Sequence, residues 1–421
     1  MDKLTPLIIT QILETIKKYA LILFIFLCPL AYSAGSSLRT SQENIFVYLS
    51  ICIVALFIGN FWLGAFLILN VVLFIHAGAS VGAAQVLNIL LGCLLFKFFR
   101  EYFKTRDFKV IYKPIVSLGL FSVFWMILQL FHIDPIFSPQ SNDGVLVVGP
   151  LTQPVGLFGI CMSQAIFLSI CIPILASLFS IWIAALFLVP IAILKTSAAF
   201  LSVAVVGLFY IYHLHKKYFI YSLVFIILCG GFFIAKDFKT DPKTFTSRFL
   251  PWHSAIKYFG QNPFGYGPDS YRNQNKLKQF IFLGDSKFNH LIGRQEPDGK
   301  LFMKYYSITN DQSEVERMNA EALMDGTLKD HVDYWDNPHN DYIKQLFEYG
   351  IIGFLLLVGF MRELILRFKR SVKDKDLITI SSCILVYFVS GLTQFPMELA
   401  RIAYLFPIFL AAFDVKTEEL C

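Results

Sequence analysis

The sequence predicts an all-α polytopic membrane protein with about twelve transmembrane helices and one large, partly helical extracytoplasmic loop. The 421-residue chain is 56% hydrophobic and only 16% charged, with a mean hydropathy of +0.61, whereas soluble domains carry about 25% charged residues. Uncharged apolar runs long enough to cross a bilayer recur along the chain. One long polar stretch, residues 237–344, separates two groups of these runs.

About nine predicted helices fall in an N-terminal membrane region, residues 1–236, and about three in a C-terminal membrane region, residues 345–421. The first apolar stretch follows Lys3, Lys17 and Lys18. No small-residue cleavage site stands out behind it, so we expect a first membrane helix rather than a signal peptide. The predicted spans are 19–37, 45–59, 60–77, 82–99, 111–132, 153–171, 174–193, 196–213, 218–236, 345–366, 377–395 and 399–415.

Three short connections rich in Lys and Arg predict the orientation of these helices. They are "KFFREYFKTRDFK" at 97–109, "HLHKK" at 213–217 and "RFKRSVKDK" at 367–375. Such connections remain in the cytoplasm under the positive-inside rule. The polar stretch 237–344 is then expected on the extracytoplasmic side.

This large loop has the composition of a folded segment. It contains Trp252, Trp335 and many Tyr and Phe residues, and long connections of this kind are usually functional or disordered. Its charge is uneven, with eight basic and four acidic residues at 237–287 but five basic and eleven acidic residues at 288–341. The basic half could face a phosphate or anionic head groups, and equally the two halves could neutralise each other.

Signatures of metal, nucleotide and redox chemistry are missing. The eight histidines form no H-E-x-x-H or Cys/His cluster. None of the eight cysteines falls in the polar loop, so a disulfide framework is not expected. "GYG" at 265–267 lacks the rest of a phosphate-binding loop, which disfavours an ATP-driven pump. We therefore expect neither a metal nor a cofactor.

Residues 337–353, "NPHNDYIKQLFEYGIIG", place a titratable side chain at the mouth of an apolar helix. Proline is favoured in a first helical turn, so a helix starting near Pro338 is predicted. One face of that helix would carry His339, Ile343, Leu346, Gly350 and Gly353. The two glycines would then let a neighbouring helix approach closely.

A simpler interpretation of the same segment is structural. His339 and Asn340 would form a cap-like pair, and an interfacial aromatic belt would follow. Asp341 and Glu348 would orient donors or stay hydrated near the outer boundary. The belt would consist of Tyr342, Phe347 and Tyr349.

Two blocks of this sequence resemble the O-antigen ligase superfamily. "PHNDYIKQLFEYGIIGFLLLV" at 338–358 looks like the family's His-Asn segment, acid-containing helix and G-x-x-G. "SRFLPWHSAIKYFGQNPFGYGPDSY" at 247–271 is similar to its Arg, Trp and P-x-G-x-G block. Weaker similarities lie at 149–165 and 194–208, where Ala198 stands at a position that members often fill with arginine.

The resemblance implies metal-independent glycosyl transfer at the outer face of the bacterial cytoplasmic (inner) membrane. The donor would be a glycan on undecaprenyl diphosphate, and the acceptor a hydroxyl of a lipid A core sugar, of another lipid-linked glycan or of a protein. His339 would be the general base, Asn340 would position the acceptor or the imidazole, and Arg248 would stabilise the diphosphate. Further candidates for substrate binding are Lys195, Arg272 and Arg401.

Several alternatives stay open at this point. Ligases, polysaccharide polymerases and protein oligosaccharyltransferases of the family share this machinery, and no residue here separates them. Arg272 could be a surface residue, Lys195 could mark the membrane boundary, and Arg401 could pair with Glu398. A secondary transporter would have a similar number of spans, but transporters tend to show two related halves, and no halves of this sequence align.

Overall fold

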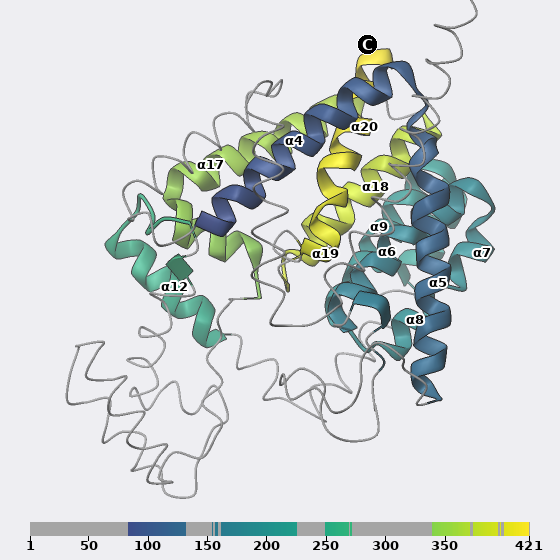
Figure 1. Ribbon diagram of the computed structural model, residues 1–421, viewed down its shortest axis with the longest axis horizontal. Helices are drawn as coiled ribbons and strands as arrows, with labels where there is room; N and C mark the ends of the chain where they lie inside the picture. The colour runs from purple at the N-terminus through teal and green to yellow at the C-terminus, as the bar shows by residue number, and fades with distance from the viewer. Residues whose placement is uncertain are drawn as a thin grey trace, which may run out of the picture.

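The computed structural model describes residues 83–131, 154, 156–158, 161–224, 249–268, 270–271, 339–370, 374–394, 396 and 400–420. Regular structure within these residues is entirely helical, and the longer helices pack as a bundle (Figure 1). The helices are α4 (Ala83–Thr105), η1 (Phe108–Ile111), α5 (Tyr112–Leu130), η2 (Gly156–Phe158), α6 (Cys161–Leu178), α7 (Ile181–Ala185), α8 (Leu188–Ile193), α9 (Ser197–Leu214), η3 (Lys216–Tyr218), α12 (Phe249–Gln261), α17 (Asp341–Arg370), α18 (Lys375–Ser390), α19 (Ala400–Ala403) and α20 (Leu405–Leu420).

Four helical segments are long and apolar enough to cross a membrane. They are Phe108–Leu130, α6, α9 and α17. The prediction of an all-helical protein with several candidate membrane spans is therefore confirmed. The total of about twelve stays a prediction, because the first three predicted spans lie outside the described residues.

The predicted span at 174–193 is wrong as a single helix. Ser180 accepts a hydrogen bond from the Ile183 amide through its hydroxyl, and this cap begins a separate short helix, α7. A further turn at residues 186–187 separates α7 from α8. The preceding helix, predicted at 153–171, instead occupies Cys161–Leu178 and follows the short helix η2.

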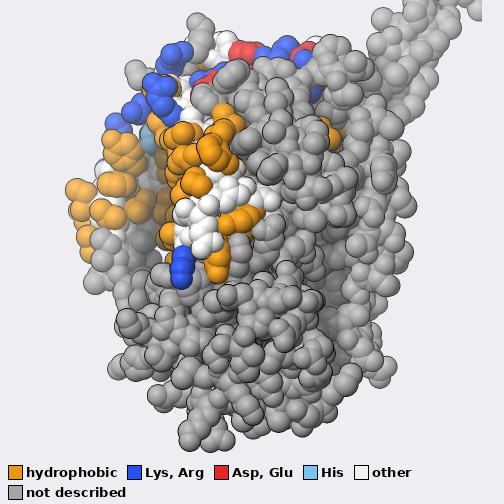
Figure 2. Space-filling model, turned by 90° about the vertical axis from the view of Figure 1, so that its left-hand side faces the viewer, with side chains coloured by type: hydrophobic (Ala, Val, Ile, Leu, Met, Phe, Trp, Pro, Cys, Tyr) orange, Lys and Arg blue, Asp and Glu red, His pale blue; other side chains and the backbone are white. Residues whose placement is uncertain are grey.

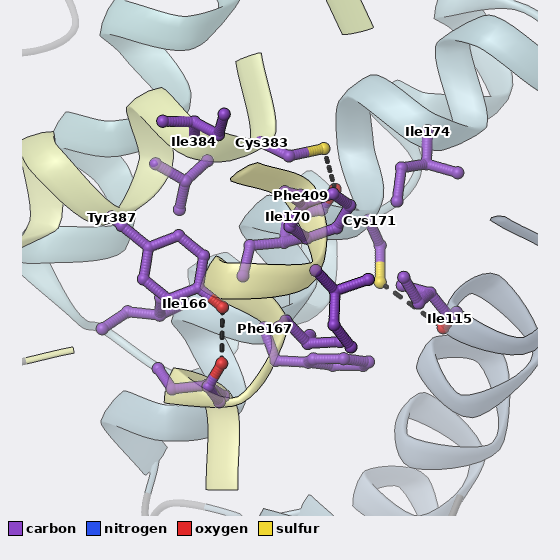
Figure 3. Packing of buried hydrophobic residues seen from close by; sticks show 14 of the residues in the cluster. Ile115, Ile166, Phe167, Ile170, Cys171, Ile174, Cys383, Ile384, Tyr387 and Phe409 are labelled. Atoms are coloured by element: carbon purple, nitrogen blue, oxygen red, sulfur yellow. Dashed lines mark hydrogen bonds between the residues drawn. The ribbon is translucent and has the colours of Figure 1, made fainter. Parts of the chain in front are cut away.

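The core of the bundle lies where α6 packs against α9 and α18. Figure 3 shows Ile170 and Cys171 of α6 beside Cys383 and Tyr387 of α18. The two thiols are fully buried, and each lies within 3.8 Å of a backbone carbonyl of a neighbouring helix. They act here as small apolar side chains with weak donors.

The three Lys- and Arg-rich connections meet at one end of the bundle, which we call the basic end. Arg100 of α4 and Arg367 of α17 both pair with Asp414 of α20. Lys109 pairs with Asp376 at 2.8 Å, which brings the start of α5 to the start of α18. Connections that lie on one side of the membrane must be at the same end of the bundle, and these connections are. The basic end lies near the C-terminus in Figure 1.

The opposite end, which we call the His339 end, contains the starts of α6, α9 and α17 and the C-terminus of α18. Its place follows from the helix directions, because the C-terminal ends of α9 and α17 touch each other at the basic end. Part of the polar loop is helical, as predicted, since α12 lies within it.

Candidate functional site

The start of α17 differs from its prediction. The helix begins at Asp341 rather than near Pro338, and His339 precedes it in a left-handed conformation with φ 50°. Asn340 is the N-cap, and its Oδ1 accepts hydrogen bonds at 3.0 Å from the amides of Tyr342 and Ile343. The predicted common face is therefore wrong, because His339 is outside the helix. Gly350, with φ 62° and ψ −162°, also breaks the helix into two parts.

The His339 imidazole is held by a buried side chain. Its Nδ1 lies 2.9 Å from the Oε1 atom of Gln394, in the turn after α18. An amide oxygen can only accept, so Nδ1 is the donor in this hydrogen bond, and in a neutral imidazole the lone pair then lies on Nε2. Gln394 was not among the predicted site residues. The only signal for it was a polar residue at the end of the predicted span 377–395.

Three further hydrogen bonds fix the start of α17 on the C-terminus of α18. Asn340 Nδ2 donates to the Leu392 carbonyl at 2.9 Å, and the Asp341 amide donates to the Gly391 carbonyl at 2.9 Å. The Tyr342 hydroxyl donates to the carbonyl of Phe388, in the last turn of α18, at 2.7 Å. These contacts satisfy carbonyls that a helix C-terminus leaves without an intrahelical partner. They also hold the backbone on which His339 sits.

The two sequence blocks that carry the family resemblance come together in space. The amide of Gly267 donates to the Glu348 carbonyl at 2.9 Å, and the amide of Ile351 donates to the Pro263 carbonyl at 2.8 Å. We call this contact of residues 263–267 with residues 347–351 the glycine interlock. A Cβ on Gly350 would lie 2.3 Å from the Phe264 carbonyl carbon. The segment that packs closely on Gly350 is thus the loop after α12. The sequence had predicted a neighbouring helix at this position.

A buried ion pair and an aromatic cluster support the interlock. Lys344 Nζ lies 3.5 Å from Glu348 Oε1, and the same oxygen accepts from the Tyr271 amide at 3.3 Å. Phe347 stacks on Tyr266 with ring centroids 4.7 Å apart. Glu348 and Phe347 have no exposed surface. Of the two roles predicted for Glu348, hydration is therefore wrong and the orienting of donors remains, and the prediction of an interfacial Phe347 is wrong.

The same correction applies to Tyr349, which is 1% exposed rather than part of a belt. Tyr266 has its own partner, because its hydroxyl donates to the Tyr258 carbonyl at 2.9 Å. Burial raises the pKa of the Tyr266 hydroxyl, which therefore remains a neutral donor. Tyr258 and Tyr266 pack with Tyr271 and Phe347 in a small core between α12 and α17.

Lys195 lies in the short turn between α8 and α9, as expected from the sequence, and its side chain is exposed. It belongs to the His339 end, because α9 starts there. Among the described residues other than glycine, only Lys195 and His339 have positive φ values. Such conformations cost free energy and concentrate at functional sites. Ala198 is fully buried in the first turn of α9.

The remaining predicted residues are not brought together by the described structure. Arg248 and Arg272 lie outside the described residues, and so does the side chain of Arg401 in α19. In the described part of the chain, no group of three or more His, Cys, Asp or Glu residues could hold a metal ion. The arrangement that remains is an imidazole held through Nδ1 by the side-chain amide of Gln394, next to the start of a helix. An imidazole is a side chain suited to act as a general base.

Neither the protein-family models nor the curated proteins compared with this chain match it.

Proposed function

We propose that this chain is a membrane glycosyltransferase that moves a glycan from undecaprenyl diphosphate to an acceptor hydroxyl, with His339 as the general base. The observation that carries the proposal is the bond between His339 Nδ1 and Gln394 Oε1, because donation from Nδ1 puts the lone pair of a neutral imidazole on Nε2. The glycine interlock supports it too, since it joins the two blocks that resemble the O-antigen ligase superfamily.

The proposed reaction is a single displacement. His339 Nε2 takes the proton of the acceptor hydroxyl as its oxygen forms a bond to the anomeric carbon. The bond from that carbon to the diphosphate oxygen breaks, and its electron pair leaves with the diphosphate. Attack opposite the leaving group inverts the anomeric centre. His339 precedes a candidate membrane span, and the diphosphate of a lipid carrier lies at the membrane boundary.

The leaving diphosphate needs cationic partners as its charge grows. Of the four predicted cations, Lys195 is the one whose side chain the structure describes, and it is exposed at the His339 end. Arg248, Arg272 and Arg401 stay predictions from the sequence. We expect Lys195→Ala to lower transfer and Lys195→Arg to preserve it, because the role needs a positive charge at that turn. Full activity of Lys195→Ala would remove this residue from the site.

The acceptor defines three versions of the proposal. A lipid A core sugar would make the chain an O-antigen ligase, another lipid-linked glycan a polymerase, and a protein hydroxyl an oligosaccharyltransferase. The chemistry at His339 is common to all three. Offering each acceptor in turn to the reconstituted protein separates them.

The decisive experiment measures transfer from a lipid-linked donor in proteoliposomes, with all variants present in equal amounts. His339→Ala should lower the rate by about 10²-fold or more. Gln394→Glu still accepts from Nδ1, so it should retain activity. The acid limb of its pH–rate profile should move to higher pH, because a carboxylate stabilises the imidazolium.

Gln394→Leu is the matched variant that removes the acceptor, and we expect a lower rate without that pH shift. Chelators should leave transfer by the wild-type protein unchanged. Wild-type rates in His339→Ala would rule out the assigned base. A chain that instead moves a soluble solute across the vesicle membrane, with no glycan transfer, would favour a transporter.

A further inference from the structure

Four exposed cations gather where α9 and α17 end. Lys216 and Lys217 belong to η3, directly after α9, and Lys369 and Arg370 are the last residues of α17. Phe368 joins the two helix ends, because its ring lies 5.2 Å from the rings of both Phe209 and His213. We call this group of four cations the cationic corner.

The acids of the basic end are engaged with other cations. Asp414 pairs with Arg100 and Arg367, Asp376 with Lys109, and Asp374 with Lys416. Residues 197–224, which include α9 and η3, contain no Asp or Glu. No ion pair within the described part of the chain neutralises the cationic corner. Among the described residues, these cations are therefore exposed without an ion pair, and an anion from outside the described helices could bind them.

The surroundings of the cationic corner suit the head-group region of a bilayer. α9 and α17 are both candidate membrane spans, so residues at their ends lie at head-group depth. Lys216 Nζ lies 5.7 Å from the centre of the Tyr212 ring, and Lys217 Nζ lies 4.8 Å from that of Tyr218. Both tyrosines are exposed, as is typical of an interfacial aromatic belt. Figure 2 shows Lys and Arg side chains gathered at one end of the described surface, with hydrophobic side chains extending away from them.

We propose that the cationic corner binds the phosphate of anionic phospholipids, such as phosphatidylglycerol, from the adjacent leaflet. Clusters of Lys and Arg beside a membrane span attract anionic head groups, and charge-assisted hydrogen bonds to phosphate are strong. A bound head group would hold the ends of α9 and α17 at one depth. Because α17 begins beside His339, this contact would steady the helix from its far end. The proposal does not depend on the reaction assigned to His339.

The test compares two full-length variants that lose equal charge at the same end of the bundle. The first combines Lys216→Gln, Lys217→Gln, Lys369→Gln and Arg370→Gln. The control combines Lys104→Gln, Arg106→Gln, Lys113→Gln and Lys375→Gln. Each protein is placed in nanodiscs containing equal phosphatidylglycerol and phosphatidylcholine, and the lipids that it retains after extraction are counted by native mass spectrometry.

We expect the first variant to lose its preference for phosphatidylglycerol by about tenfold, and the control to stay within about twofold of wild type. Equal losses in the two variants would point to net charge alone and would overturn the site. Unchanged retention in the first variant would overturn it as well. If the fourfold variant fails to fold, the two pairs, 216–217 and 369–370, are exchanged separately, and each should show a partial loss.

Discussion

The two ends of α17 are held by different kinds of interaction. At the His339 end, buried amides and backbone hydrogen bonds fix the chain, including those of Asn340 and Gln394. At the basic end, the contacts are ion pairs between side chains such as Arg367 and Asp414. Backbone contacts have one geometry, whereas long charged side chains adapt to small displacements. The end that carries the candidate base is thus the one with the less adaptable contacts.

The two ends of α17 also differ in backbone strain and in the exposure of their side chains. His339 has a positive φ value, which in a residue other than glycine persists only where the surroundings determine it strongly. At the basic end, the side chains of Glu101 and Glu418 are 50% and 49% exposed. Exposed pairs contribute about 0–1 kcal/mol each. We therefore expect substitutions at the His339 end to cost more stability than substitutions at the basic end.

The largest effect should come from Gly350→Ala. Its φ and ψ values are almost exclusive to glycine, and the new Cβ would meet three backbone atoms within 2.6 Å. We expect a loss of about 4–5 kcal/mol in the free energy of unfolding, from strain plus the broken interlock. Unfolding in mixed micelles with increasing SDS measures it. Gly207→Ala in α9 is the control, because a Cβ there meets nothing within 4 Å. Equal stability of the two variants would contradict the interlock.

The buried pair below the interlock should give the next largest effect. Glu348→Leu leaves Lys344 without its buried anion, and breaking such a pair costs about 3 kcal/mol or more. Combining Glu348→Leu with Lys344→Met should recover most of that loss, because the uncompensated charge is removed as well. The measurement is a double-mutant cycle of unfolding free energies. Additive losses would show that the two side chains act independently.

Within the described residues, the sequence predicted several helices from their long apolar runs. The spans predicted at 111–132 and 196–213 lie within a few residues of Tyr112–Leu130 and Ser197–Leu214. It failed at 174–193, where the Ser180 cap outweighs the apolar composition. At the candidate site, it singled out His339 but missed Gln394 and the burial of Glu348. Both depend on contacts between segments far apart in the sequence, which local periodicity does not contain.

Asn340→Ala tests the docking of α17 on α18 more gently. The substitution removes the N-cap and the bond to the Leu392 carbonyl, so we expect a loss of about 1–2 kcal/mol. Asn340→Asp keeps the capping oxygen and should lose less. Both losses are measured in the same mixed micelles. Their ratio separates the contribution of the N-cap oxygen from that of the hydrogen bond to the Leu392 carbonyl. A larger loss for Asp than for Ala would show that the cap contributes little.

The smallest effects should lie at the basic end. Asp414 accepts from Arg100 through one carboxylate oxygen and from Arg367 through the other. Asp414→Asn keeps only one acceptor oxygen, so we expect a loss of about 1 kcal/mol, since the site is partly buried. Glu418→Gln weakens a more exposed pair and should cost under about 0.5 kcal/mol. Raising the salt concentration should shrink both losses, because salt screens exposed charges, and should leave the loss in Gly350→Ala unchanged. The opposite result would be a larger loss of unfolding free energy for Asp414→Asn than for Asn340→Ala, persisting at high salt. The contacts at the basic end would then contribute more to stability than those at the His339 end.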